Sequence, residues 1–126
     1  MLHHVEINVS NLENAKRFYF WLLPELGYSL YQQWEKGFSF KKEETYIVFV
    51  QTESRYLEIP YHRSGIGLNH LAFHGTREQI DRLTIEMKKM GIPILYEDRH
   101  PYAGGPGYYA VFFEGPDRLK LEIAAD

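Results

Sequence analysis

Residues 4–19 read HVEINVSNLENAKRFY, and this stretch decides the fold. Its first six residues alternate between polar and apolar side chains, which predicts a strand over residues 2–9 with one apolar face. Ser10-Asn11-Leu12-Glu13 then forms a capping-box pattern, in which a serine opens a helix and a glutamate follows three residues later. An apolar stripe at helical spacing comes next, and Pro24 and Gly27 close the helix. The stretch therefore predicts a strand that leads directly into an amphipathic helix.

The same order of elements occurs twice along the chain. Strand-like runs at residues 28–33, 37–41 and 45–51 complete a β-α-β-β-β order, and a polar connector follows at residues 52–67. The second half then repeats the strand, the capped helix and three further strands. The strands of this half are expected at residues 68–73, 92–97, 108–113 and 119–124. Its helix opens with the capping box Thr76-Arg77-Glu78-Gln79 and ends at Gly91. The apolar stripe of that helix consists of Ile80, Leu83, Met87 and Met90.

This repeat bounds the domain organisation. A β-α-β-β-β unit cannot cover its own sheet, so two such units are expected to share one core. A length of 126 residues also predicts one domain. We therefore predict a single α+β domain over residues 1–126, made of module one (1–51), the connector (52–67) and module two (68–126).

Composition and charge exclude several classes of function. Lys plus Arg is 14 and Asp plus Glu is 17, so the formal charge of −3 lacks the basic excess of a nucleic-acid-binding protein. The absence of cysteine excludes disulfides, iron–sulfur clusters and thiolate zinc sites, and it fits a cytoplasmic location. The N-terminus does not read as a signal peptide, and no apolar run reaches the roughly 20 residues of a membrane span. The expected protein therefore binds neither nucleic acid nor a membrane.

Two histidines and one carboxylate lie on matching faces of the predicted strands. His4 and His70 stand at equivalent places in the repeat, and the alternation turns both away from the helix side. Glu122 alternates with apolar neighbours in the last strand and faces the same way. Imidazole nitrogens and carboxylate oxygens bind Zn, Ni, Co, Mn or Fe(II), and three protein ligands leave positions open for water or substrate. On pattern alone, a catalytic metal site and three hydrogen-bonded structural residues are equal alternatives.

Three motifs give the chain a resemblance to the vicinal-oxygen-chelate superfamily. They are residues 4–19 followed by Leu26-Gly27-Tyr28, residues 67–73 (GLNHLAF) and residues 112–122 (FFEGPDRLKLE). The superfamily includes glyoxalase I, fosfomycin-resistance thiol transferases, bleomycin-resistance proteins and extradiol dioxygenases, and the resemblance covers essentially the whole chain. It implies two βαβββ modules that form a curled mixed sheet, shaped as a cup, with the helices on the outside.

The resemblance also implies a metal site. In metal-using members the cup holds one divalent ion that chelates vicinal oxygens of the substrate, and the ligands of the family map onto His4, His70 and Glu122. Laying residues 46–51 on residues 119–124 places Phe49 opposite Glu122, so the fourth ligand of glyoxalase I is missing unless Gln51 replaces it. The chain therefore resembles the His-His-Glu members.

Some members of the superfamily fit the chain less well. Metal-free bleomycin binders lack the His-His-Glu set that this chain keeps. Fosfomycin enzymes carry a basic residue after the last strand, where this chain has Ala124-Ala125. Extradiol dioxygenases usually have four modules, about twice this length.

Further candidate residues lie near the predicted cup. Glu6 shares the face of His4 and is expected to act as a general base or to orient a ligand, the alternative being a solvated carboxylate. Lys120 shares the face of Glu122 and is a candidate for holding an anionic group of the substrate, the alternative being exposure to solvent.

An irregular loop at residues 98–107 has no counterpart in the first half. It is either a lid, in which His100 and Tyr102 touch substrate, or a plain surface loop. Tyr109 is taken as a substrate-binding residue, although the sequence does not decide which tyrosines line the pocket. The others that could do so are Tyr108, Tyr56 and Tyr61.

These residues support two main functions. The first is a glyoxalase-like, metal-dependent enzyme for a small molecule with vicinal oxygens, in which Glu122 or Glu6 moves a proton; lyase or isomerase, transferase and oxygenase chemistry all stay open. The second is a binding protein of the same fold that sequesters a small molecule without catalysis. A purely structural metal is a third possibility. The resemblance also implies a homodimer, since members of this fold often pair.

Overall fold

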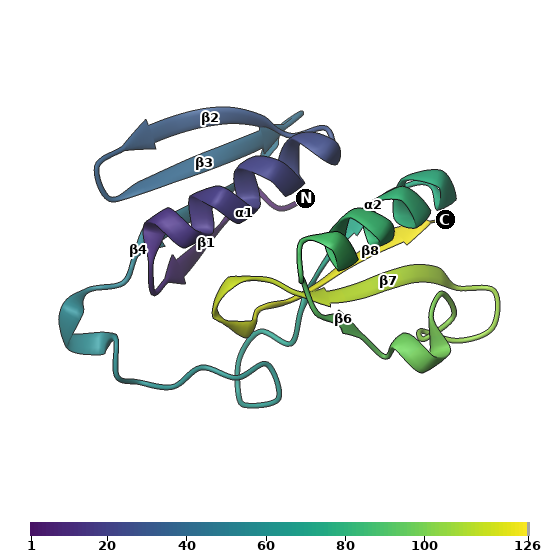
Figure 1. Ribbon diagram of the computed structural model, residues 1–126. Helices are drawn as coiled ribbons and strands as arrows, with labels where there is room; N and C mark the ends of the chain where they lie inside the picture. The colour runs from purple at the N-terminus through teal and green to yellow at the C-terminus, as the bar shows by residue number, and fades with distance from the viewer. Residues whose placement is uncertain (126) are drawn as a thin grey trace. The chain divides into compact units, whose positions relative to one another are not determined.

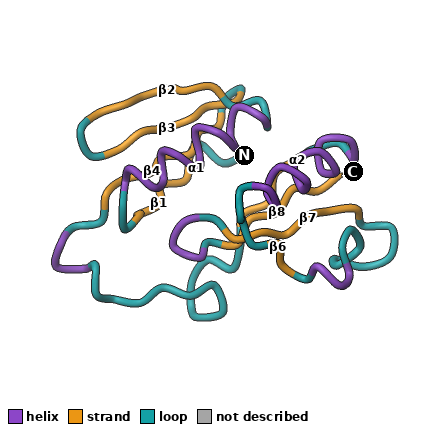
Figure 2. The backbone as a smooth tube through the Cα atoms, viewed as in Figure 1, coloured by secondary structure: helices purple, strands orange, loops and turns teal. Residues whose placement is uncertain are grey.

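The computed structural model describes residues 1–125, and Asp126 lies outside the described residues. The chain divides into two compact units, the first over Met1–Pro60 and the second from Tyr61 onward. The division falls inside the predicted connector, which contains one short 3₁₀ turn, η1 (Ser54–Tyr56). Figures 1 and 2 show the elements of each unit.

The first unit has the predicted order β-α-β-β-β. Its elements are β1 (His4–Val9), α1 (Leu12–Glu25), β2 (Ser29–Trp34), β3 (Gly37–Lys42) and β4 (Thr45–Gln51). The strand order is β1-β4-β3-β2, in which β1 pairs with β4 in parallel and the other pairs are antiparallel. Parallel pairing needs a crossover connection, and α1 with the β2–β3 hairpin supplies it.

Helix α1 packs its apolar stripe on one face of this sheet. Tyr19 of α1 is 2% exposed and stacks on Phe49 of β4, with ring centroids 3.9 Å apart. Phe38 of β3 is fully buried and also stacks on Phe49, with ring centroids 5.1 Å apart. Stacked rings of this kind combine a large apolar burial with favourable aromatic geometry. The core of the first unit therefore lies between α1 and the sheet.

The start of α1 differs by one residue from the prediction. Asn11, not Ser10, is the N-cap, and its side chain accepts a hydrogen bond from the Asn14 backbone N–H. Asparagine and serine are about equally good N-caps. The helix also continues through Pro24 and ends at Glu25, and Gly27 then adopts a positive φ of 89° that an L side chain rarely tolerates.

The second unit repeats the order. Its elements are β5 (Leu71–His74), α2 (Arg77–Lys89), β6 (Ile94–Leu95), η2 (Glu97–Arg99), β7 (Tyr109–Glu114), η3 (Pro116–Arg118) and β8 (Lys120–Ala125). The strand order is β5-β8-β7-β6, with β5 and β8 parallel. Hydrogen bonds among residues 1–125 thus form two four-stranded mixed sheets, each with its own helix, which confirms the two βαβββ modules.

Helix α2 begins as predicted and ends earlier than its apolar stripe. Thr76 and Gln79 form the capping box, with both reciprocal hydrogen bonds present. Ile80, Leu83 and Met87 are completely buried, but Met90 is 51% exposed, so its assignment to the core was wrong. The reason is that Met90 is the C-cap: the chain leaves the helix there through Gly91, whose φ is 74°.

Two strands are shorter than the alternation indicates. β5 begins at Leu71, which the register pairs with Leu121 of β8, three residues later than the alternation indicates. β6 has only two residues because Tyr96 adopts a left-handed conformation, with φ 55° and ψ 38°, which ends the extended backbone. Among residues 1–125, no helix has the length and apolar character needed to cross a membrane.

Candidate metal and substrate site

Strand β8 presents a buried carboxylate on the face of its sheet that is turned away from α2. Leu121 and Ile123 are fully buried on the α2 side, so Lys120, Glu122 and Ala124 point to the other face. Glu122 is only 2% exposed. A carboxylate buried to this extent is costly unless charged or hydrogen-bonding groups satisfy its oxygens. The partners of Glu122 therefore define the site.

One partner is His70, which directly precedes β5. Its Nε2 lies 2.9 Å from Oε2 of Glu122. Its other ring nitrogen, Nδ1, lies 2.7 Å from Oδ1 of Asn69, and this contact orients the imidazole with Nε2 toward the carboxylate. His70 and Glu122 are two of the three predicted metal ligands, and the fold brings them together.

The second partner is Tyr108, whose hydroxyl donates to Oε1 of Glu122 at 2.5 Å. The ring of Tyr108 lies close against Gly104: a Cβ at residue 104 would be 2.4 Å from Cδ1 of Tyr108. The loop at residues 98–107 therefore contacts the site indirectly, because its Gly104 packs against Tyr108. Both oxygens of Glu122 are engaged, one by His70 and one by Tyr108.

The donor set of the second unit fits part of a metal site. A neutral imidazole nitrogen and a carboxylate oxygen, such as those of His70 and Glu122, are ligands for a borderline divalent ion. Within residues 1–125 no group of three or more His, Asp or Glu side chains is assembled, so His70 and Glu122 need a further ligand.

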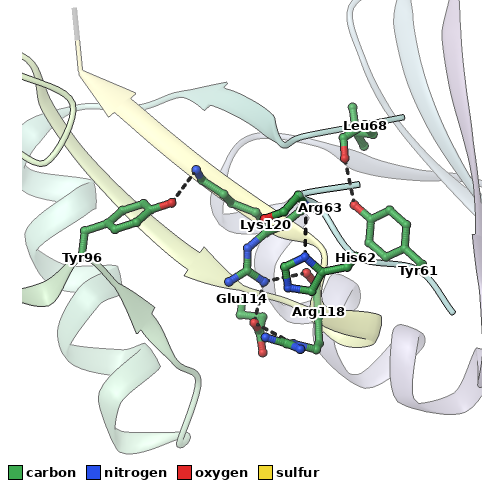
Figure 3. Close-up of polar contacts among 9 residues, drawn as sticks. Tyr61, His62, Arg63, Leu68, Tyr96, Glu114, Arg118 and Lys120 are labelled. Carbon is green, nitrogen blue, oxygen red and sulfur yellow. Dashed lines mark hydrogen bonds and ion pairs between the residues drawn. The ribbon is translucent and has the colours of Figure 1, made fainter. Parts of the chain in front are cut away.

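A cation and an aromatic ring lie beside Glu122 on the same face. Lys120 donates from Nζ to the hydroxyl of Tyr96 at 2.8 Å, and the two side chains point toward each other in Figure 3. The ammonium also lies 4.8 Å from the centroid of the Tyr96 ring and 5.3 Å from that of Phe112. Lys120, predicted to hold an anionic group, is therefore located next to the proposed ligands.

An ion cluster fixes the end of the connector to this sheet. Glu114 of β7 accepts from Nη1 of Arg63 at 2.7 Å and from Nε of Arg118 at 3.4 Å. Arg63 also donates to the backbone carbonyl of Arg118 at 3.1 Å, as Figure 3 shows. Burial opposes ionisation of Glu114, but the two guanidinium groups outweigh it and lower the pKa of this carboxyl from its usual value.

Replacing Glu114 by Gln is expected to destabilise the protein by about 1–2 kcal/mol at neutral pH, because it leaves the mostly buried Arg63 without its carboxylate. A carboxyl with a lowered folded-state pKa contributes stability that is complete above its unfolded pKa and is lost as the pH falls through the folded pKa. Urea unfolding from pH 7 to pH 3 should show the difference between wild type and Glu114→Gln shrinking as the pH falls below about 4.3, the ordinary pKa of a glutamate. Glu53→Gln is the matched control, since its pair with Arg55 is exposed and should contribute nothing measurable. A difference that grows toward acid pH would contradict this assignment.

In the first unit, His4 and Glu6 lie on the face of β1 turned away from α1, as predicted. Both are exposed, while Val5, Ile7 and Val9 alternate toward the core. The His4 ring stacks on Tyr46, with centroids 4.7 Å apart and planes within 5°. Its Nδ1 lies 2.8 Å from Nδ1 of His3. His4 is thus held by aromatic contacts and carries an exposed imidazole.

The register of β1 and β4 corrects the position assigned to a fourth ligand. His4 pairs with Tyr46 and Glu6 with Val48, so Val48, not Phe49, is the counterpart of Glu122. Phe49 faces α1, so the alignment of residues 46–51 with residues 119–124 was shifted by one residue. Gln51 shares the α1 side: its Oε1 accepts from the Leu12 N–H and its Nε2 donates to the Ser10 carbonyl. The Gln51 amide therefore supports the start of α1 and is not on the face of His4.

The remaining predicted substrate residues gather on the other side of the second sheet. Tyr109 alternates with Val111 and Phe113 toward α2, and its hydroxyl donates to Asp81 of that helix. Tyr102 packs edge-on against Tyr109, at 5.6 Å between centroids. The structure does not bring these two tyrosines to Glu122.

His100 also lies near α2. Burial is the main reason that its pKa is lowered, and the positive charge of Lys88 acts in the same direction, while Asp81 and Glu97 oppose the shift. The residue on the Glu122 face is Tyr108, which the sequence did not distinguish from Tyr109. Alternation with Phe112 and Glu114 was the available signal.

Comparison with known proteins agrees with the fold of the two modules. Residues 3–112 match the family model described as the Glyoxalase/Bleomycin resistance protein/Dioxygenase superfamily. YqjT, an uncharacterized protein of Bacillus subtilis strain 168, is 51% identical over 125 residues, which are 98% of each chain. The crystal structure of a candidate glyoxalase from Bacillus halodurans is 59% identical and has a TM-score of 0.98, covering 100% of this chain and 96% of that one. The fosfomycin resistance protein FosX of Listeria monocytogenes, 21% identical, shares the fold with a TM-score of 0.71 over 100% of this chain and 93% of that one.

Proposed function

The chain belongs to the glyoxalase/bleomycin resistance protein/dioxygenase superfamily, and on that premise we propose that it is a metal-dependent enzyme acting on a small molecule with vicinal oxygens. His4, His70 and Glu122 are its proposed ligands for one divalent ion. The class of ion is Zn, Ni, Co, Mn or Fe(II), all of which accept imidazole and carboxylate donors. The reaction is a lyase or isomerase, transferase or oxygenase step.

The observation that carries this proposal is the contact between Nε2 of His70 and Oε2 of Glu122 at 2.9 Å. The Glu122 side chain is only 2% exposed, and an acidic side chain buried to this extent is seldom unpaired. It faces the His70 imidazole, whose other nitrogen contacts Asn69 and so orients the ring. Such an arrangement, a buried carboxylate beside an oriented imidazole, is what a preorganised pair of ligands requires. Tyr108 holds the second carboxylate oxygen and so limits rotation of the group.

The residues of the chain have distinct parts in this proposal. A bound ion would supply Lewis-acid chemistry, by polarising an oxygen of the substrate. His70 and Glu122 would bind the ion from module two, and His4 would be its ligand from module one. Glu6, exposed on the same face of β1 as His4, is the proposed general base. Glu122 is the alternative proton carrier.

The test is the metal content of untagged protein, measured by mass spectrometry after incubation with each of the five ions and removal of excess metal. About one ion per chain is expected in the wild type and in His74→Ala, which removes an exposed histidine from the end of β5. The double variant His4→Ala/His70→Ala should lose it. The metal form that binds is then screened with isomerase, thiol-transferase and oxygenase substrates.

An absence of bound metal in the wild type under all five conditions would contradict the enzyme proposal. The alternative from the sequence, a binding protein without catalysis, would then account for the fold, and thermal-shift screening with small molecules would identify its ligand. The proposed homodimer is checked in parallel by sedimentation of the metal-loaded protein, and the proposed cytoplasmic location by cell fractionation.

A further inference from the structure

We propose that Lys120 and Tyr96 form a subsite for an anionic group of the substrate. The substrate would then be a vicinal-oxygen compound that also carries a carboxylate or another oxyanion. This inference rests on the proposed function in one respect: the vicinal oxygens are placed at His70 and Glu122. The subsite itself is argued from contacts within the second unit.

The first argument is position. Lys120 and Glu122 are two residues apart in β8, so their Cβ atoms lie on the same face about 7 Å apart. The Phe112 ring, on the neighbouring strand β7, is close to both the imidazole and the ammonium: its centroid is 6.1 Å from that of His70 and 5.3 Å from Nζ of Lys120. A small molecule bound at His70 and Glu122 would therefore have the Lys120 ammonium within reach across one aromatic ring.

The second argument is charge. Lys120 forms no ion pair with any carboxylate in residues 1–125; its contacts are the Tyr96 hydroxyl and two ring faces. The nearest acid by register is Glu114, which pairs with Lys120 across β7 and β8. Glu114 is taken by Arg63 and Arg118, as Figure 3 shows. Its commitment to two arginines leaves the lysine charge available to a ligand.

The third argument is the hydrogen-bonding capacity of the pair. The Tyr96 hydroxyl accepts from Lys120, so its own proton is free to be donated, and the ammonium keeps two further N–H groups. Donors from a hydroxyl and an ammonium 2.8 Å apart match two oxygens of one carboxylate or phosphate group. Arg99 adds a second cation, with its guanidinium carbon 5.1 Å from the Tyr96 ring centroid.

The backbone supports a functional role for Tyr96. Its φ of 55° is unusual for an aromatic residue, and this conformation ends β6 after two residues. The ring then reaches Phe112 at 5.5 Å and Lys120 at 4.8 Å. Strained backbone of this kind is often kept where it positions a functional side chain.

The test compares two ligands that share a pair of vicinal oxygens and differ by one carboxylate: catechol and 3,4-dihydroxybenzoate. Binding to the metal-loaded protein is measured by calorimetry in low salt. We expect the carboxylate to tighten binding to the wild type by about tenfold, because it adds a charge-assisted contact. Lys120→Met, which keeps the length of the side chain over Phe112, should remove that gain, so that the two ligands bind the variant with about equal affinity.

Three further variants complete the test. Lys120→Arg should retain most of the gain, Tyr96→Phe should reduce it, and Lys89→Met, a loss of an exposed lysine on α2, should not change it. A gain that survives Lys120→Met, or no gain in the wild type, would overturn the subsite.

Benzoate binding to metal-free protein, followed by NMR, separates this inference from the proposed function. If catechol does not bind but benzoate binds in a Lys120-dependent manner, the metal proposal fails and the subsite stands. If catechol binds and neither carboxylate shows a dependence on Lys120, the metal proposal stands and the subsite is wrong.

Discussion

If Glu122 is a ligand of the proposed divalent ion, replacing it by Gln is expected to weaken binding of that ion by about 100-fold or more, on the order of 3 kcal/mol. The substitution keeps the volume of a side chain that is 2% exposed, and its amide oxygen can still accept from Tyr108. It removes the negative charge that faces Nε2 of His70, which is what an ion at this position needs. Competition with a fluorescent chelator measures the change in affinity.

The control for this prediction is Glu78→Gln, which removes an exposed carboxylate in the first turn of α2. Its metal affinity should equal that of the wild type. Circular dichroism of Glu122→Gln should remain native, so that a loss of metal is not a loss of fold. An unchanged affinity in Glu122→Gln would show that the buried carboxylate is structural.

Replacing Phe113 by Ala is expected to destabilise the protein by about 3–5 kcal/mol. Phe113 is fully buried in β7 on the side that α2 covers, so its removal leaves a cavity between helix and sheet. Urea unfolding measures the loss. Ile85→Ala, a truncation at a residue 57% exposed on the outer side of α2, should stay within about 0.5 kcal/mol of the wild type. Equal stability of Phe113→Ala and Ile85→Ala would contradict the packing of β7 against α2.

Most of what could be predicted of the site came from the alternation of polar and apolar side chains along the strands. It placed Glu122 opposite two buried apolar neighbours and His4 opposite a buried face, and the structure agrees at both positions. The same rule, applied to β7, separates Tyr108 from Tyr109: even-numbered residues share the face of Phe112, and Tyr109 reaches Asp81 of α2 instead. The choice of Tyr109 as a substrate residue came from composition rather than from this period.

Register and backbone conformation were the parts that sequence could not supply. An error of one residue turns a side chain to the other face of a sheet, and this is why Phe49 was taken for the counterpart of Glu122 where the structure has Val48. The contact between Lys120 and Tyr96 depends on a left-handed residue that no local pattern marks, since glycine is the usual residue at positive φ. The capping box of α2 was readable because both of its hydrogen bonds are local.

The central proposal is that His4 of the first module and His70 with Glu122 of the second are ligands of the same ion. X-ray absorption at the metal edge, on protein loaded with one equivalent of Zn, tests it most directly, because multiple scattering counts the imidazole ligands. Two imidazoles and at least one oxygen donor are expected in the wild type, and one imidazole in both His4→Ala and His70→Ala. A wild-type spectrum with a single imidazole, unchanged in His4→Ala, would contradict the proposal.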